Sequence, residues 1–472
     1  MTQQTIKIKP ITRIEGNAHI SLFLEDGKVN DAHFQVTELK GFEKFLEGRM
    51  VQEMPRYTTR LCGICPVSHH LAAAKATDAL FEAPVPPAAN LLRELMGVGQ
   101  LLQSHALHFF FLAAPDFVVG PDAPPEARNL FGLIRKDKGL VKNALKMRTV
   151  GQTIIEKTGG KAVHPVSAIP GGMSHPLSQE DRDLLLKMTQ DIMPAIRKTL
   201  EVGRTLIAKF EDIVGLDRNL QTHYLSLVQP SGALNLYDGV LRFMRADGMV
   251  DADFKGNQYD NFIAERTTDH SYIKLPYYSP LGWPNGIYRV GPLARLNVAD
   301  RIETEYAGEA LKEFKSVFGS PAHQTFLYNV ARLVEMVYAN ERAAEILQDS
   351  QVTSTHVNDP IEPKAGHGIG VVEAPRGTLI HSYKADHGGK VVRANFIVAT
   401  THNNPGINLS VKEVANSCLS TNMAEQAMLD RVEMVVRAYD PCLTCAAHAQ
   451  GRMPLTLSFY EQGKLVRQVY RQ

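Results

Sequence analysis

The chain has 472 residues, of which 44% are hydrophobic and 21% charged, and its 35 glycines and 26 prolines are ordinary for a globular protein. This composition excludes disordered, collagen-like and fibrous proteins, and the length allows roughly three domain equivalents with a large buried interior. Lys and Arg total 51 against 50 Asp and Glu, a formal net charge of +1. Without a basic cluster, nucleic acid is not an expected partner.

The N-terminus lacks the apolar stretch of about 7 to 15 residues that a secretory signal needs, and no apolar run approaches the roughly 18 residues of a membrane span. We therefore expect a soluble, cytoplasmic protein with no membrane partner. Five cysteines are too few for a disulfide scaffold of this length. Their positions matter more than their number.

The first predicted elements are short strands over residues 5 to 9, 18 to 24 and 29 to 37. The last two are joined by Glu25-Asp26-Gly27-Lys28, a favourable hairpin turn. The chain thus begins with a small β-unit.

Long helices follow. Leucines recur at helical spacing from residue 88 to 114, where Pro115 is expected to end the run, and Ser178-x-x-Asp181 opens a second helix that reaches about residue 212. Two further helices are predicted over 322 to 349 and 421 to 437. These four segments predict a bundle of long helices.

Two regions rich in turn residues interrupt the helices, at 226 to 298 and 351 to 406, and the second holds strand candidates at 369 to 373, 378 to 384 and 390 to 400. The predicted fold is α+β, mainly α, with a bundle of long helices and small β-rich N-terminal and insertion regions. Because there is no internal repeat or flexible linker, residues 1 to 448 are predicted to form one interlaced domain whose ends meet in space.

Four cysteines form two Cys-x-x-Cys pairs, in Arg60-Leu-Cys62-Gly-Ile-Cys65-Pro-Val-Ser-His69 and in Asp440-Pro-Cys442-Leu-Thr-Cys445-Ala-Ala-His448. Four thiolates suit a soft metal, and structural zinc is the simplest interpretation. Zinc ribbons usually separate their pairs by about 15 to 20 residues, whereas these pairs stand at opposite ends of the chain. The site would close the whole fold instead of a local loop.

Five segments in order resemble the large catalytic subunit of nickel-iron hydrogenases. They are the two cysteine segments, Arg13-Ile-Glu15-Gly16, Glu373-Ala-Pro375-Arg376-Gly377 and Val398-Ala-Thr400-Thr401. The resemblance spans nearly the whole chain. Within the family, the segments at 41 to 45, 65 to 70 and 288 to 297 are most similar to the cytoplasmic, bidirectional, NAD-linked enzymes.

The resemblance implies a nickel held by Cys62, Cys65, Cys442 and Cys445, with Cys65 and Cys445 also bridging to an iron that carries carbon monoxide and cyanide. The implied activity is reversible, heterolytic cleavage of H2 to protons and electrons. Cys442, a terminal thiolate, is the implied first base. An open position between two metals and a neighbouring base are what this reaction requires.

Two charged residues gain roles from the same resemblance. Glu15 would take the proton from Cys442 and pass it toward solvent, although by itself it could equally be an ion-pair partner of Arg13 or a surface carboxylate. Arg376 would lie over the open coordination position, where a planar, permanently charged guanidinium suits better than Lys. Its simpler interpretation is a solvent-facing arginine in a turn.

Further residues are implied around the metals. Thr400, Thr401 and Pro375 would surround the iron's cyanide, although Thr400 could be an ordinary strand threonine. His69 would donate to the sulfur of Cys65, although a lone histidine is often only a core residue.

Asp440 would hold Arg376, although it could also serve only as a helix terminus. Glu43 and His448 match positions that hold Mg²⁺ in the family, with a backbone carbonyl near Phe396 contributing.

Cys418 alone cannot hold an iron-sulfur cluster, so electrons must leave through a partner. The resemblance implies an iron-sulfur small subunit, with diaphorase subunits beyond it that carry flavin and iron-sulfur clusters and reduce NAD or NADP. No Gly-x-Gly-x-x-Gly follows a strand, so the nicotinamide site should lie elsewhere. The alternatives are a cytoplasmic hydrogenase with another acceptor, or a complex I-like electron-transfer subunit without hydrogen chemistry.

Residues 449 to 472 match a C-terminal extension that a maturation endopeptidase removes in the family once nickel is inserted. Alternating residues from Leu455 to Phe459, a turn at Glu461-Gln-Gly463-Lys464 and a return from Leu465 to Tyr470 predict a short β-hairpin. The alternative is that this hairpin is a permanent edge of the fold.

Overall fold

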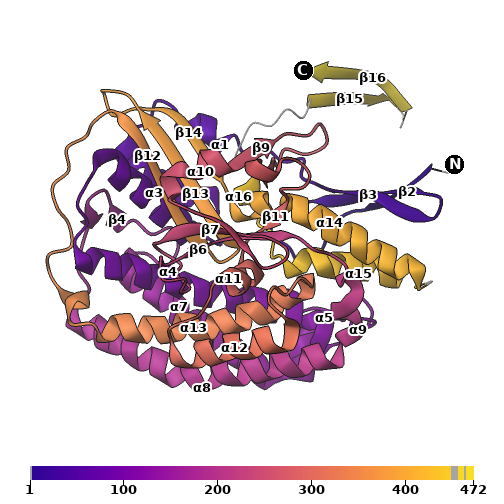
Figure 1. Cartoon of the computed structure of the whole chain (residues 1–472), viewed down its shortest axis with the longest axis horizontal. Helices are drawn as coiled ribbons and strands as arrows, with labels where there is room; N and C mark the ends of the chain where they lie inside the picture. The colour runs from indigo at the N-terminus through magenta and orange to yellow at the C-terminus, as the bar shows by residue number, and fades with distance from the viewer. Residues whose placement is uncertain (1–2, 422, 448–454, 462–463, 472) are drawn as a thin grey trace.

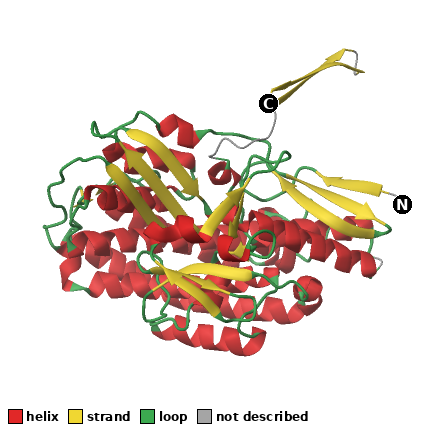
Figure 2. Cartoon of the chain, turned by 45° about the horizontal axis from the view of Figure 1, so that its top comes forward, coloured by secondary structure: helices red, strands yellow, loops and turns green. Residues whose placement is uncertain are grey.

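The computed structural model describes residues 3–421, 423–447, 455–461 and 464–471. Helices form most of the body, and the strands form several small separate sheets (Figures 1 and 2). Within the described ranges no helix is long and apolar enough to cross a membrane. Because helices form most of the body and the strands form small sheets, the mainly helical α+β fold predicted from the sequence is confirmed.

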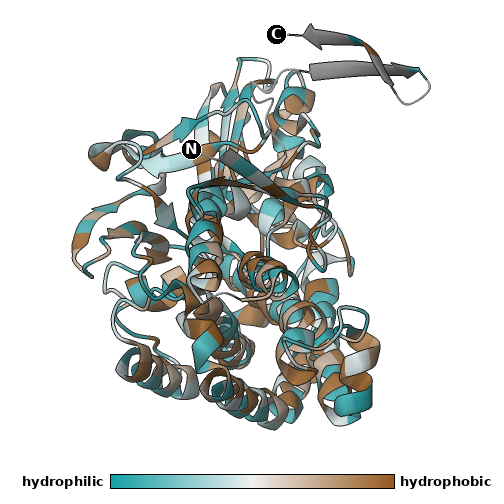
Figure 3. Ribbon diagram, turned by 90° about the vertical axis from the view of Figure 1, so that its right-hand side faces the viewer, coloured by the Kyte–Doolittle hydropathy of each residue, from teal (hydrophilic) through white to brown (hydrophobic). Residues whose placement is uncertain are grey.

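Four long helices make the helical layer: α4 (Pro87–Leu107), α7 (Lys138–Gly159), α8 (Gln179–Lys209) and α13 (Tyr328–Gln348). Helix α4 packs against both α7 and α13, and α13 packs against α8. Glycines allow the close contact of α4 and α7, because a Cβ on Gly151 would lie 2.4 Å from the carbonyl oxygen of Gly99. The helices of the body carry both hydrophobic and hydrophilic residues in Figure 3, as amphipathic packing requires.

The remaining helices are shorter or lie closer to the sheets. They are α1 (Phe42–Leu46), α2 (Met54–Thr58), α3 (Pro66–Phe81), α5 (Ala114–Val118), α6 (Leu130–Lys136), α9 (Glu211–Val214), α10 (Tyr259–Phe262), α11 (Pro292–Val298), α12 (Glu305–Phe318), α14 (Ala399–Ser420), α15 (Glu425–Ala438) and α16 (Leu443–Ala446).

Two helix boundaries follow from local chemistry. Ser178 is the N-cap of α8, as predicted, and its Oγ accepts from the Asp181 backbone N–H at 3.1 Å. The expected stop at Pro115 is wrong, because α4 continues through a π-helical turn (His108–Ala113) into α5, where Pro115 occupies a first-turn position that needs no N–H donor.

The strands form antiparallel hairpins with one parallel pairing. The N-terminal sheet is β1 (Gln3–Ile8), β2 (His19–Glu25) and β3 (Lys28–Gln35), with the predicted turn at residues 25 to 28. A second sheet contains β12 (Gly366–Ala374), β13 (Gly377–Ala385) and β14 (Val391–Ile397). A third contains β6 (His223–Val228), β7 (Val240–Met244), β8 (Val250–Phe254) and β11 (Tyr288–Arg289), the last parallel to β6.

Short pairs complete the sheets: β4 (Ala168–Ile169) with β5 (Gly172–Met173), and β9 (Ile263–Arg266) with β10 (Leu275–Tyr278). The expected strand from 390 to 400 ends at Ile397, and α14 begins at Ala399. The sequence Asn403-Asn404-Pro405-Gly406 suggests a turn but lies inside α14, where Asn403 Oδ1 accepts from the Val290 backbone N–H at 2.9 Å. Burial and this bond override the local turn signal.

One contiguous hydrophobic core includes residues from Ile8 to Ala447, so the two ends of the body share an interior. A parallel backbone bridge pairs Glu15 with Cys442, and the Lys40 N–H donates to the Ala447 carbonyl at 2.9 Å. The predicted C-terminal hairpin is present as β15 (Leu455–Glu461) and β16 (Lys464–Arg471), drawn beyond the body in Figures 1 and 2.

Candidate metal centre and active site

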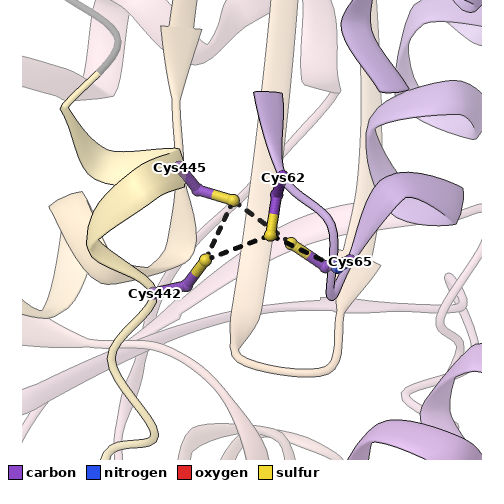
Figure 4. A group of neighbouring side chains, drawn as sticks. All are labelled: Cys62, Cys65, Cys442 and Cys445. Carbon is purple, nitrogen blue, oxygen red and sulfur yellow. Dashed lines mark hydrogen bonds between the residues drawn. The ribbon is translucent and has the colours of Figure 1, made fainter. Parts of the chain in front are cut away.

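The four paired cysteines converge in the structure. Their sulfur atoms all lie within 4.8 Å of one another, and all four residues are buried (Figure 4). The closest pairs are Cys442 with Cys445 at 3.1 Å, Cys65 with Cys445 at 3.2 Å and Cys62 with Cys442 at 3.4 Å. A group of this kind joins the beginning and the end of the fold.

The N-termini of two helices orient these side chains. Cys65 is the N-cap of α3, with Pro66 in the first turn, and Cys442 is the N-cap of α16. The backbone N–H groups of Ile64 and Cys65 donate to Cys62 Sγ at 3.2 and 3.4 Å. Such donors stabilise a sulfur that carries negative charge.

The surroundings shift the pKa values of these thiols in opposite directions. Hydrogen bonds from Cys442 and the other cysteines lower the pKa of Cys62, which makes it the most readily ionised of the group. Burial, together with the hydrogen bond to Cys442, raises the pKa of Cys445 well above its ordinary value. A metal must therefore displace protons when it binds here, and metal retention will weaken in acid.

Arg376 covers one side of the sulfur group. Its side chain is only 4% exposed, its Nε donates to the Asp440 carbonyl at 2.7 Å, and its Nη2 donates to Asp440 Oδ1 at 2.9 Å. Burial disfavours its charge, but Asp440 and the cysteine thiolates outweigh this and raise the pKa of Arg376. Arg376 is thus a fixed buried cation and not a solvent-facing residue.

A second buried arginine holds the turn that carries Arg376. Arg295 forms ion pairs with Glu335 at 2.5 Å and with Glu373 at 2.8 Å, and donates to the Pro375 carbonyl at 3.0 Å. Burial raises the pKa of Glu335, but Arg295 outweighs this and brings it down to about 2. The sequence interpretation missed Arg295, which lies in a segment used only to compare subgroups.

The loop at residues 13 to 16 lies against the Cys442 segment. The carbonyl of Glu15 accepts from the Leu443 N–H at 3.2 Å, and Glu15 Oε2 accepts from the Thr444 N–H at 3.0 Å. Arg13 pairs with Asp116, so its described ion pair is not with Glu15. The structure therefore places the Glu15 carboxylate, which is partly buried, beside the C-terminal cysteine pair.

A small cavity of roughly 10 Å³, about the space that one water molecule needs, adjoins the sulfurs. Thr400 lines it from the first turn of α14, so it is not a strand threonine, and its Oγ1 accepts from the Cys442 N–H at 2.9 Å. Pro375 and Arg376 line the opposite part of the cavity, and Leu379 and Val398 make its wall partly apolar. Thr401 is fully buried next to Thr400.

Comparisons with known proteins identify this arrangement. A family model described as nickel-dependent hydrogenase matches residues 40–123 and 236–448, and one described as HoxL-like matches residues 5–39. The chain belongs to the nickel-dependent hydrogenase family. The NAD-reducing hydrogenase HoxS subunit beta of Cupriavidus necator is 37% identical over 478 residues, which cover 97% of this chain and 98% of that protein.

Two other hydrogenases are also similar to the chain. In Methanocaldococcus jannaschii, the vhu polypeptide of the F420-non-reducing hydrogenase is 46% identical over 411 residues, 87% of this chain and 98% of that one. The crystal structure of an NAD+-reducing NiFe-hydrogenase in the H2-reduced state superposes with a TM-score of 0.91 at 41% identity, covering 94% of this chain and 99% of that one. The predicted family is therefore confirmed, and the chain is the catalytic large subunit of a nickel-iron hydrogenase.

The residues present fit a nickel-iron centre. Four buried sulfurs are the soft ligand set that nickel requires, and Arg376 and Thr400 line a small cavity beside them. Among the described residues, Arg376 Nη1 and Thr401 Oγ1 are buried without a hydrogen-bond partner. Such donors suit small buried anions, whereas a closed structural zinc site needs neither a cavity nor a guanidinium.

The sulfur in the described contact of His69 is not the one expected from the sequence. Its Nε2 lies 3.3 Å from Cys445 Sγ, whereas the sequence suggested Cys65 as the contacted sulfur. His69 lies in the first turn of α3, where side chains point toward the helix N-terminus, and there Cys445 Sγ lies only 3.2 Å from Cys65 Sγ. The contacted sulfur therefore belongs to the C-terminal cysteine pair.

The proposed Mg²⁺ residues are placed only in part. Glu43 Oε1 accepts from the Phe396 backbone N–H at 2.8 Å, which brings together two of the three segments expected there. His448 lies outside the described residues, so the third segment has no described position.

Proposed function

We propose that the chain catalyses reversible, heterolytic cleavage of H2 at a nickel-iron centre held by Cys62, Cys65, Cys442 and Cys445. When bound, this centre polarises H2 so that it separates into protons and electrons. The observation that carries the proposal is the convergence of four buried sulfurs with one buried guanidinium beside a small cavity.

Each neighbouring residue has a specific task in this proposal. Cys442 accepts the first proton at its sulfur, and Glu15 receives it at Oε1, since Oε2 is engaged by the Thr444 N–H. Arg376 presents Nη1 to the cavity while Asp440 fixes the orientation of its planar group. Thr400 fixes the Cys442 backbone, and Thr401 offers a hydroxyl to the iron's small ligands.

Replacing a single cysteine by serine and measuring the retained nickel tests the ligand set. Cys442→Ser in the full chain should abolish nickel retention, because an alkoxide is a poor ligand for a soft metal. Cys418→Ser is the matched control, since Cys418 is equally buried but belongs to α14 and not to the sulfur group. Nickel retained in Cys442→Ser at the level of Cys418→Ser would contradict the assignment.

We further propose that electrons leave through an iron-sulfur small subunit to flavin-containing diaphorase subunits that reduce NAD or NADP in the cytoplasm. The similarity to two NAD-reducing hydrogenases supports this acceptor. The 46% identity to an F420-non-reducing hydrogenase supports the alternative of a cytoplasmic hydrogenase with another acceptor. Purification of the native complex decides between them: co-purifying flavin subunits with H2-dependent NAD(P) reduction support the first, and their absence the second.

We also propose that residues 1 to 448 are the mature domain and that an endopeptidase removes residues 449 to 472 after nickel insertion. Two observations support this: the family match ends at residue 448, and the shared core extends to Ala447. The four sulfurs already converge in the chain that carries β15 and β16, so removal of the tail would follow the convergence of the two cysteine pairs. Intact-mass measurement of active, nickel-containing protein should show a chain that ends at His448, and a mass including the tail would refute the proposal.

The Mg²⁺ site remains a proposal with Glu43 and His448 as its side-chain residues. Removal of Mg²⁺ by a chelator should lower the thermal midpoint of the mature enzyme, and Glu43→Gln should abolish that effect. An equal effect of the chelator on both proteins would contradict the assignment of Glu43.

A further inference from the structure

Three buried polar side chains form a continuous line that starts at one of the four sulfurs. His69 Nε2 lies 3.3 Å from Cys445 Sγ, and His69 Nδ1 lies 3.0 Å from His381 Nε2. His381 Nδ1 lies 2.7 Å from the Tyr383 hydroxyl. All three side chains are 1% exposed or less.

The fold explains why these residues meet. His381 and Tyr383 are two positions apart on β13, so both side chains project from the same face of that strand. Helix α3, which carries His69, packs on β12 and β13. The contact between His69 and His381 therefore joins residues 312 positions apart, and the aromatic ring of Phe396 packs 4.4 Å from His381 on the same sheet.

The direction of every hydrogen bond in the line follows from its ends. A metal-bound cysteine is a thiolate and can only accept, so His69 Nε2 must carry the hydrogen. A neutral imidazole has one N–H, so His69 Nδ1 accepts from His381 Nε2–H, and His381 Nδ1 accepts from Tyr383. Burial raises the pKa of Tyr383 well above its ordinary value, so its hydroxyl keeps the proton that it must donate.

We propose that His381 and Tyr383 are positioning residues that fix the tautomer of His69 and thereby keep an N–H directed at the Cys445 sulfur. The proposal rests on the proposed function, because it requires Cys445 to be a metal-bound thiolate. Hydrogen bonds to a ligating sulfur withdraw electron density and change the electronic properties of the metal centre. Each donor in the line also polarises the next, so Tyr383 acts on Cys445 although it does not touch it.

A purely structural role makes a different prediction. If the line only satisfies buried polar groups, removing the Tyr383 hydroxyl will change stability and leave the electronic state of the centre alone. If it fixes the tautomer, His381 without its donor can move its hydrogen to Nδ1, and His69 then loses the N–H that points at Cys445. The two roles are separated by a spectroscopic signature of the metal centre.

The test uses the purified, mature hydrogenase complex and the infrared bands of the iron-bound carbon monoxide and cyanide. Tyr383→Phe keeps the ring and removes only the donor, and the bands should shift to lower wavenumber because the sulfur becomes more electron-rich. Tyr224→Phe is the matched control, since the Tyr224 hydroxyl also lies 2.8 Å from an imidazole Nδ1, that of His323, outside this line. The control bands should stay at the wild-type positions.

A pair of variants at His381 provides a second measurement. His381→Leu should shift the bands in the same direction as Tyr383→Phe, and His381→Gln, whose amide can still donate toward His69, should restore them at least in part. Wild-type band positions in both Tyr383→Phe and His381→Leu would overturn the proposal. Absence of these bands from the wild-type complex would instead overturn the proposed function, so the two failures are distinguishable.

Discussion

Substituting Glu15 by Gln separates a proton relay from a structural contact. Glu15 Oε2 accepts one hydrogen bond, from the Thr444 N–H at 3.0 Å, and the Gln side-chain oxygen can accept the same bond. A charged acceptor is worth about 1.5–3 kcal/mol and a neutral one about 0.5–1.5 kcal/mol. The variant should therefore lose only about 1 kcal/mol, and its metal centre should assemble.

That loss sets a limit on what a structural role can do to the rate. A change of about 1 kcal/mol corresponds to about a fivefold change in rate, whereas losing a general acid or base costs about 10²- to 10⁴-fold. We expect Glu15→Gln to reduce exchange between H2 and solvent deuterons by about 10²-fold or more. The amide cannot take up and release a proton.

The assay is mass-spectrometric isotope exchange on enzyme with matched nickel content. Exchange does not need the electron-transfer partners, so it reports on H2 cleavage and the proton path without the electron path. Glu38→Gln is the control, because Glu38 accepts a 2.7 Å bond from Asn17 next to the same loop and has no proposed role in proton transfer. Exchange in Glu15→Gln within fivefold of this control would refute the relay role.

Three further outcomes follow from the buried charges. Arg376→Lys should retain nickel but lower turnover by about 10²-fold in an H2-oxidation assay, because an ammonium cannot reproduce the donor array, and near-normal turnover would contradict this. Arg295→Leu removes the ion-pair partner of two buried carboxylates, so it should destabilise the protein by about 3–5 kcal/mol in thermal unfolding. A change below about 1 kcal/mol would show that these carboxylates need no charged partner. Burial lowers the pKa of three histidines from 6.5 to about 4 or 3, so they are neutral when folded and become protonated on unfolding below pH 6.5. Stability should then fall as pH drops, by about 4 kcal/mol per pH unit near pH 5, and pH-independent unfolding between pH 7 and 5 would be the opposite result. These residues are His70, His105 and His402.

The convergence of the four cysteines could be anticipated because the proposed ligands stand in short local motifs. The Cys-x-x-Cys pairs and the turn that carries Arg376 each place their side chains through a helix start or a tight turn. The N-cap at Ser178 and the hairpin at residues 25 to 28 are local for the same reason. Signals within a few residues are preserved when the chain folds.

The errors came from contacts between distant segments. Val398 and Thr400 are strand-forming residues that extend the run before them, but tertiary packing ends the strand at Ile397 and starts α14 at Ala399. The sequence suggested Cys65 as the sulfur beside His69, whereas the described contact is with Cys445, because a side chain's direction across the core depends on how α3 packs. Arg295 and His381 went unrecognised because nothing near them in the sequence reveals their partners 40 or more residues away.

The central claim is that the four converging cysteines hold a nickel-iron centre. Metal analysis combined with infrared spectroscopy on the purified native complex tests it most directly. We expect nickel and iron in about equal amounts, one of each per chain, with bands from iron-bound carbon monoxide and cyanide. Zinc as the only metal, with no such bands, would contradict it.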